Sequence, residues 1–464
     1  MQKKERIRST RLGGRILWNL IMFGFMGQVA WNVENMFFNT FLFNSVYADA
    51  SQQAVDGSIG VVSAINIMVA LSAATAVITT FIMGALSDRL RRRKIFISAG
   101  YLVWGVTVMV FGVITKGNTA ALFQLSDPVA ILTATVTIVI VMDCVMTFMG
   151  STANDSAFNA WVTDVTDSTN RGTVEGILAI MPLAAMAVVM GLGGAISAIG
   201  YQTFFIALGV FVSLCGLIGF FSLKDSQTGQ RETGGSYWKE LVYGFRPSVV
   251  RENARLYLTL GAACLFNVAV QVFFPYLFIY LQHGLGLDLN ELLAGLTPGL
   301  IVGLVAAVVV VVGAIIGMGK LVDRYGKKHF INLSVILFIV GLLATAFADS
   351  LMQFVVCFVP ALIGYGMLMI MLNAAVRDFT PEGKVGLFQG VRMIFIVLLP
   401  MIIGPTIGNI SIRFFDSVPY VNDYGIVTEC PGSSMFAAAA VVSLFIFLPV
   451  YFLQKKGIDK KENS

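Results

Sequence analysis

Twelve runs of mostly apolar residues, each long enough to cross a bilayer, most constrain what this chain can fold into. A spanning helix needs about 20 such residues. Helices satisfy their own backbone hydrogen bonds in lipid, and the runs lack the short alternating segments of a membrane barrel. The sequence therefore predicts an all-α membrane protein with twelve transmembrane helices. The expected spans are 15–44, 58–86, 94–115, 129–157, 174–199, 202–223, 257–282, 296–318, 330–348, 351–375, 388–413 and 434–453.

The composition fits a membrane protein and argues against several other classes. Of 464 residues, 57% are hydrophobic and 12% are charged, whereas soluble domains carry about 25% charged residues. The five cysteines are scattered and the two histidines lie far apart, so we expect no disulfide framework, metal site or histidine-based catalytic centre. Neither a phosphate-binding Gly-Lys-Ser/Thr loop nor a dinucleotide fingerprint occurs. We expect no enzyme activity, no cofactor and no nucleic-acid partner.

The basic residues predict the orientation of the chain. Of its 31 lysines and arginines, 28 lie at the termini or in the loops that follow every second span. By the positive-inside rule, these loops and both termini are expected in the cytoplasm. The sequence thus predicts a multi-pass protein of the cell membrane that functions as a monomer, with the lipid bilayer and a small-molecule solute as partners.

The two halves of the chain share sequence marks. "GALSDRLRRRK" (84–94) follows the second span and "GKLVDRYGKKH" (319–329) follows the eighth; "VTDVTDSTNRGTVEG" (162–176) and "VRDFTPEGKVGLFQG" (376–390) follow the fourth and tenth. Equivalent loops at equivalent places indicate an internal duplication, which is how many secondary transporters are built. The expected domains are an N-terminal six-helix bundle (1–223), a cytoplasmic linker (224–256) and a C-terminal six-helix bundle (257–464).

The first pair of loops resembles the signature of the major facilitator superfamily, Gly-x-x-x-Asp-Arg-x-Gly-(Arg/Lys)-(Arg/Lys). The copy from Gly319 to Lys328 matches it fully, and the copy from Gly84 to Arg93 departs only at Arg91. The resemblance extends along the whole chain and implies the major facilitator fold, with two pseudo-symmetric six-helix bundles and a gate of paired charges on the cytoplasmic side. The residues expected at this gate are Asp88, Arg89, Arg92, Asp164, Arg171, Glu175, Asp323, Arg324 and Asp378.

A finer resemblance concerns the end of the fourth span. "NDSAFNAWVTD" (154–164) is similar to that part of the melibiose-type glycoside–pentoside–hexuronide:cation symporters. On this match, Asp155 takes the place of a carboxylate that helps to bind the coupling cation. Those symporters also carry acids on the second span, whereas residues 58–86 contain none. A second partial resemblance, to sucrose-type transporters, involves Asp143.

A polar stripe runs along the first span. Gln28, Asn32, Asn35 and Asn39 share one helical face, and Trp31 lies at its edge. Amides and an indole suit a hydroxylated solute, because amides hydrogen-bond its polar edge and the ring covers its apolar face. We expect the stripe to line the solute pocket; the alternative is hydrogen bonding between helices. Further candidates for this pocket are Asn66, Asn267, Gln271, Tyr276, Tyr365 and Asn373.

Ionisable residues inside the spans are the candidates for ion coupling. A charge at the bilayer centre costs about 2.5–3.5 kcal/mol on insertion scales, so such residues usually face a cavity or a partner. The acids Glu34, Asp143 and Asp155 are expected to bind a coupling proton or sodium ion. Arg392 would pair with an acid or bind an anionic solute. The alternatives are a solvated helix end for Asp155 and an arginine that reaches to the membrane surface.

Together these features predict a secondary active transporter. It would move a small polar solute, such as a sugar or glycoside, by alternating access coupled to a proton or sodium ion. Two other hypotheses stay open. A proton-driven exporter of amphipathic compounds would suit the 36 phenylalanines and 21 methionines, and a solute sensor would use the same scaffold without transport.

Overall fold

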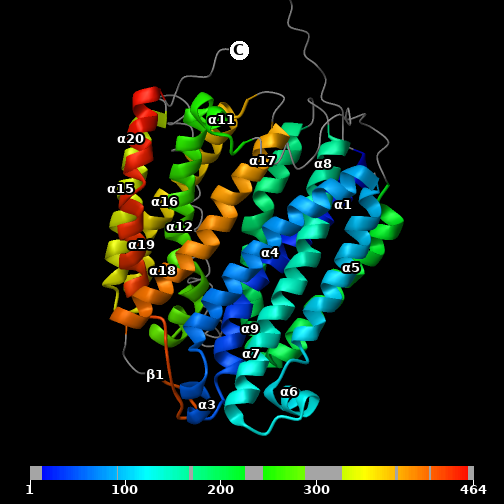
Figure 1. The fold of residues 1–464 in the computed structure, drawn as a ribbon, viewed down its shortest axis with the longest axis vertical. Helices are drawn as coiled ribbons and strands as arrows, with labels where there is room; N and C mark the ends of the chain where they lie inside the picture. Colours follow the sequence, from blue (N-terminus) through cyan, green and yellow to red (C-terminus); the bar gives the residue numbers. More distant parts are fainter. Residues whose placement is uncertain are drawn as a thin grey trace, which may run out of the picture. The chain divides into compact units, whose positions relative to one another are not determined.

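A computed structural model describes residues 13–90, 92–166, 171–224, 244–287, 327–381, 385–416 and 420–457 (Figure 1). Contacts divide the chain into two compact units. Unit 1 comprises Met1–Ser58 and Ala74–Gly234, and unit 2 comprises Ile59–Ala73 and Gly235–Ser464. One helix, α4 (Val61–Leu90), contributes its first part to unit 2 and its second part to unit 1.

The described residues confirm the prediction of an all-α membrane protein. Among them, nine helices are long and apolar enough to cross a membrane, from Gly14–Val46 to Ser434–Lys456. Two shorter apolar helices, Ala184–Gly194 and Phe330–Ala346, lie in two more of the predicted spans. The remaining predicted span, 296–318, lies outside the described residues.

Unit 1 is made of helices that pack around α5 and α9. The first helix runs without a break from Gly14 to Val46 and includes four segments. These are α1 (Gly14–Val33), η1 (Glu34–Phe38), α2 (Asn39–Phe41) and η2 (Leu42–Val46). The other elements are α3 (Gln52–Gly57), α5 (Arg93–Phe111), α6 (Lys116–Phe123), α7 (Pro128–Gly150), η3 (Ser151–Phe158), α8 (Asn159–Val165) and α9 (Arg171–Ser222).

Unit 2 contains the corresponding long helices of the second half of the chain. Within it, α12 contacts α16, α18, α19 and α20, and α15 packs along α16. Its elements are α11 (Pro247–Glu252), α12 (Ala254–Ile279), η4 (Tyr280–Gly284), α15 (Lys327–Ala346), α16 (Leu351–Phe379), α17 (Val385–Met393), η5 (Ile394–Leu398), α18 (Leu399–Phe415), α19 (Ser434–Leu444) and α20 (Phe447–Lys456).

Polar residues at several helix starts explain where those helices begin. Asp127 accepts a hydrogen bond from the Ala130 N–H, and Pro128 occupies the first position of α7. Ser350 caps α16 in the same way through the Gln353 N–H. Such caps satisfy amide groups that have no partner inside the helix. The predicted starts at 129 and 351 lie within one residue of the observed ones.

Gly200 separates the fifth and sixth predicted spans. Its φ of 76° interrupts the helical path inside α9, and this left-handed conformation favours glycine. The predicted boundary between 199 and 202 is therefore confirmed, and it results from the backbone conformation of Gly200.

The π-helical segments were not predicted from the sequence. They interrupt the first helix at Glu34–Phe38 and the fourth at Ser151–Phe158. In unit 2, a further one at Ile394–Leu398 follows α17. π-helical turns are rare and are frequently found at functional sites. Two of the three acids predicted inside the spans, Glu34 and Asp155, lie on such turns.

Outside the spanning helices, a small hairpin connects α18 to α19. Strands β1 (Tyr420–Val421) and β2 (Val427–Thr428) pair antiparallel. Just before them, the carboxylate of Asp416 accepts hydrogen bonds from the backbone N–H of Ser434 at 3.2 and 3.3 Å. Burial of this carboxyl group raises the pKa of Asp416. The bonds fix the start of α19 to the end of α18.

Glycines allow α5 and α9 to approach closely. A Cβ on Gly105 would overlap the Gly209 carbonyl and the Ser213 side chain, and a Cβ on Gly209 would overlap the Gly105 carbonyl. Small residues of this kind let membrane helices pack backbone against backbone. This contact holds α5 in place, and α5 in turn carries Tyr101 and Trp104 into the interior of unit 1.

We predict that Gly105→Val destabilises the protein by about 1–3 kcal/mol, because overpacking a close contact forces the backbones apart. The measurement is the midpoint of thermal unfolding of purified protein in detergent, which should fall by several degrees. Gly191→Ala is the matched control, since nothing lies within 4 Å of the added methyl group. Equal midpoints for the two variants would contradict the role assigned to this contact.

Candidate functional site

The three acids predicted inside the spans all lie in unit 1. Glu34 is the first residue of η1, Asp143 lies in the middle of α7, and Asp155 lies in η3. The exposed fraction is 8% for Glu34 and 2% for Asp143, and Asp155 is half-buried. The same helices carry buried hydroxyl groups, so the acids lie in a polar strip of an otherwise apolar core.

Glu34 is held by a hydroxyl group of the fourth helix. The Thr147 Oγ1 donates a hydrogen bond of 3.0 Å to Glu34 Oε1. Asp143 lies one turn before Thr147 and therefore on the same face of α7. The two acids thus share one region between the first and fourth helices.

Asp155 has a similar local partner. The Ser151 Oγ donates a hydrogen bond of 2.9 Å to Asp155 Oδ2 across one turn of η3. The indole N–H of Trp31 faces the same carboxylate, outside the geometry of a normal hydrogen bond. The ring of Trp31 packs against Trp104 with centroids 5.0 Å apart. Trp31, predicted from the stripe, is therefore next to Asp155, predicted from the motif.

Tyr101 joins three helices beside this acid, and the sequence analysis missed it. Its hydroxyl donates to the Phe23 carbonyl at 2.6 Å and accepts from Asn154 Nδ2, also at 2.6 Å. Gly27 lies directly against both Tyr101 and Asn154. The only available signal was a tyrosine inside an apolar run, which gives no indication of its partners.

The asparagines of the amide stripe form hydrogen bonds with the backbone of their own helix. Asn32, Asn35 and Asn39 each donate from Nδ2 to the carbonyl four residues earlier, at 2.8–2.9 Å. These bonds turn the side-chain oxygen of each amide away from that carbonyl. Gln28, Asn32 and Asn35 are half-exposed, whereas Asn39 is buried. The exposed part of the stripe therefore presents amide oxygens, which are hydrogen-bond acceptors.

In unit 2, the first part of α4 is bonded to α18 and α12. Asn66 Oδ1 accepts from Thr406 Oγ1 at 3.2 Å, and the side chains of Ser63 and Asn409 lie 3.3–3.4 Å apart. The hydroxyl of Tyr276 lies 3.0 Å from the Pro405 carbonyl and 3.5 Å from that of Val62. Asn66 and Tyr276 are thus both part of contacts between helices.

The other residues of unit 2 that were predicted to line the solute pocket make separate contacts. Asn267 donates to the Ala263 carbonyl of its own helix at 2.8 Å. Gln271 packs against Gly404, and the ring of Tyr365 lies 5.4 Å from that of Phe266. Asn373 is half-buried on α16. The structure does not join these four side chains into one cluster.

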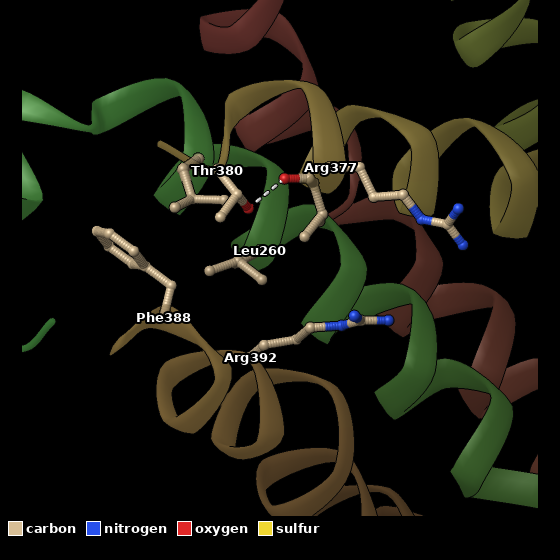
Figure 2. Close-up of a pocket in the computed structure, with 7 residues that line it drawn as sticks. Leu260, Arg377, Thr380, Phe388 and Arg392 are labelled. Carbon is tan, nitrogen blue, oxygen red and sulfur yellow. Dashed lines mark hydrogen bonds between the residues drawn. The ribbon is translucent and has the colours of Figure 1, made fainter. Parts of the chain in front are cut away.

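Arg392, predicted as an ion-coupling residue, lines a cavity at the end of unit 2. The cavity has a volume of about 130 Å³. A second arginine, Arg377, lines it as well (Figure 2). The remaining lining residues are Leu256, Leu260, Val376, Thr380 and Phe388.

The predicted gate is described only in part. In unit 1, Asp164 accepts a hydrogen bond of 3.2 Å from Arg93 Nε, and the Arg93 guanidinium also donates to Ser87 Oγ at 2.6 Å. This ion pair joins the two loop motifs of the first half. Arg92 and Asp378 are exposed. The side chains of Asp88, Arg89, Arg171, Glu175, Asp323 and Arg324 lie outside the described part of the structure.

Comparison with known protein families gives a match across nearly the whole chain. A family model described as Major Facilitator Superfamily matches residues 35–318 and 307–464. No curated protein matches the chain significantly.

Solved structures of two transporters are similar in fold. A mutant of the nucleoside transporter NupG aligns with a TM-score of 0.63 at 12% identity, over 95% of this chain and 99% of that one. A bacterial homologue of the human lysosomal transporter Spinster, inward-facing and unoccupied, aligns with a TM-score of 0.62 at 14% identity, over 95% and 96% of the two chains. At these identities the likeness concerns the fold alone.

We predict that Tyr101→Phe lowers the free energy of unfolding by about 1–3 kcal/mol, because it leaves the buried Phe23 carbonyl and the Asn154 amide without the hydroxyl group. Thermal unfolding in detergent measures the effect. Tyr424→Phe, which removes the same group from an exposed tyrosine, should leave the midpoint unchanged. If both variants unfold at the wild-type temperature, the Tyr101 hydroxyl does not hold the three helices together.

Proposed function

The chain belongs to the Major Facilitator Superfamily, and we propose that it moves a neutral, hydroxylated solute together with a proton. It is a transporter rather than an enzyme. The identity of the solute, the coupling ion and the roles of individual residues are the proposal.

The acids inside the spanning helices of unit 1 are the observation that carries the proposal. Glu34 and Asp155 each accept a hydrogen bond from a hydroxyl group, Thr147 and Ser151 respectively. Asp143 lies one turn from Thr147. Ionisable residues at such depth in a membrane protein are expensive, and they commonly mark a proton or ion pathway.

Hydroxyl partners favour a proton as the coupling ion. A hydroxyl group donates to an ionised carboxylate and accepts from a protonated one, so Thr147 and Ser151 can serve both forms by rotating one hydrogen. Sodium would instead need several oxygen ligands around one point. We therefore propose that Glu34 and Asp155 take up and release the proton and that Asp143, one turn from Thr147, assists.

The solute would be recognised beside these acids. Asn32 and Asn35 present amide oxygens on the half-exposed face of the first helix, and these accept hydrogen bonds from hydroxyl groups. Trp31, packed on Trp104, offers a flat surface to the apolar face of a ring. A sugar or glycoside has both features. A nucleoside, as in the name of the similar NupG structure, shares them through its ribose.

We also propose that the first part of α4 opens during transport. Alternating access requires the two halves of a transporter to move relative to each other, and α4 contributes to both units. Its bonds from Ser63 to Asn409 and from Asn66 to Thr406 would then hold one state closed. Separation of these residues would accompany the change to the other state.

The proposal predicts concentrative uptake driven by a proton gradient. Purified protein in vesicles is given labelled sugars, glycosides and nucleosides under an imposed pH difference. With one proton per solute, a difference of one unit supports about tenfold accumulation, because 1.4 kcal/mol corresponds to a factor of ten. Glu34→Gln and Asp155→Asn should abolish this accumulation but keep the exchange of solute between equal concentrations.

Asp56→Asn is the matched control, because it neutralises an exposed acid whose side chain accepts a hydrogen bond from nearby Gln52. It should accumulate solute as the wild type does. Accumulation driven by sodium alone would refute a proton as the coupling ion. Full accumulation by both test variants would refute the proposed roles of Glu34 and Asp155. Export under the same gradient would favour the amphipathic-compound exporter, and binding without movement would favour a sensor.

A cross-link tests the opening of α4. Cysteines in the Ser63→Cys/Asn409→Cys variant, joined by a short bifunctional thiol reagent, should stop transport, and cleavage of the cross-link should restore it. The two single variants share the same background cysteines and should keep transport after the same treatment. Undiminished transport by the cross-linked double variant would show that these residues stay together throughout the cycle.

A further inference from the structure

The cavity lined by Arg377 and Arg392 lies where three helices of unit 2 begin or end. Leu256 is near the start of α12, Arg377 and Thr380 are at the end of α16, and Arg392 is in α17. In Figure 1, α11, α17 and the end of α20 lie at this end of unit 2, and β1 lies at the other. The cavity is therefore at the level where spanning helices leave the hydrocarbon.

Two arginines, Arg377 and Arg392, line this cavity. Figure 2 shows both guanidinium groups pointing to the same side, away from Phe388. Among the described residues that line the cavity, none is an aspartate or a glutamate. The Thr380 hydroxyl donates to the Val376 carbonyl at 2.6 Å. The arginines would therefore be the groups that bind an anion in this cavity. Paired guanidinium groups suit the oxygens of a phosphate, which they can bind through two parallel hydrogen bonds each.

The rest of the cavity wall is apolar. Leu256, Leu260, Val376 and Phe388 line it together with the arginines, and Leu260 lies one helical turn deeper than Leu256. A small inorganic anion would leave this surface without a partner. A phosphate attached to an apolar chain would occupy both parts, with the phosphate at the arginines and carbon atoms along the leucines and Phe388.

Exposed charged residues surround the cavity. The bases Arg251 of α11, Lys328 of α15 and Lys456 of α20 lie at this end of unit 2, together with the acids Glu252 and Asp378. The loops here are the ones that the positive-inside rule assigns to the cytoplasm. Anionic lipids give that side of the membrane a negative surface, and basic pockets between helices are known places for their headgroups.

We propose that this cavity binds the phosphate group of an anionic phospholipid, with Arg377 and Arg392 as its ligands. The shared chemistry is a phosphate ester next to an apolar chain. The lipid would bridge the ends of α12, α16 and α17. This site belongs to unit 2, and it does not depend on the solute that is transported.

The test uses the full-length protein in nanodiscs of phosphatidylcholine with increasing amounts of phosphatidylglycerol. Retained lipids are counted by native mass spectrometry, and unfolding temperature is followed in parallel. Wild type should retain phosphatidylglycerol selectively, and Arg377→Gln/Arg392→Gln should bind it at least about tenfold more weakly, given about 1 kcal/mol per basic residue near a charged surface. Arg377→Lys/Arg392→Lys keeps both charges and should bind with intermediate affinity.

Arg251→Gln/Lys456→Gln removes the same total charge from the same end without touching the cavity, and it should retain the lipid. Equal loss in this control would show that general surface charge attracts the lipid and would overturn the site. Absence of selective retention by the wild type would overturn it as well. A third arm adds inorganic phosphate and glycerol 3-phosphate to phosphatidylcholine nanodiscs. Stabilisation by these ions, without retention of phosphatidylglycerol, would assign the cavity to a soluble phosphate instead.

Discussion

The burial of carboxyl groups in a lipid-embedded chain is the constraint on which the rest of unit 1 depends. Glu34 and Asp143 are almost completely buried, and a carboxyl group at that depth is tolerated only with polar partners. The hydroxyl groups of Thr147 and Ser151 supply them for Glu34 and Asp155. Both of these acids lie on π-helical turns, where the wider backbone changes the direction of successive side chains.

Close helix packing and the polar cluster support each other. Gly27 of the first helix touches Asn154 and Tyr101, and Gly150 of the fourth touches Trp31 and Trp104. A side chain at either glycine would separate the helices that bring Asp155 and Trp31 together. The geometry of the candidate site is thus fixed by small residues that carry no chemistry themselves.

The sequence predicted the fold class and much of the local structure, because those follow from apolar length, helix caps and loop motifs. The break at Gly200 agrees with that analysis. The ion pair of Arg93 with Asp164 within the first half was not predicted, because Arg93 was not among the expected gate residues. Partners across helices were not predictable. Helical spacing places Asn32 and Asn35 on one face, but it does not reveal that each amide bonds to its own backbone.

The same limit applies to residues that a motif does not mark. Tyr101 sits in an apolar run, and nothing in its neighbourhood indicates contact with Phe23 and Asn154. The hydrogen bonds of Ser63 and Asn66 to helix α18 were likewise not predictable, because they depend on where two segments that are distant in sequence meet in the fold. The second arginine of the unit 2 cavity, Arg377, was visible in the sequence only as a topogenic charge.

The central claim is that the buried acids exchange a proton when the solute binds. The most direct measurement adds a transported solute to purified protein in lightly buffered detergent solution and follows the pH with an indicator dye. The account predicts proton uptake that saturates with the solute and disappears in the Glu34→Gln/Asp155→Asn double variant. An unchanged pH at saturating solute, or the same uptake in the double variant, would contradict it.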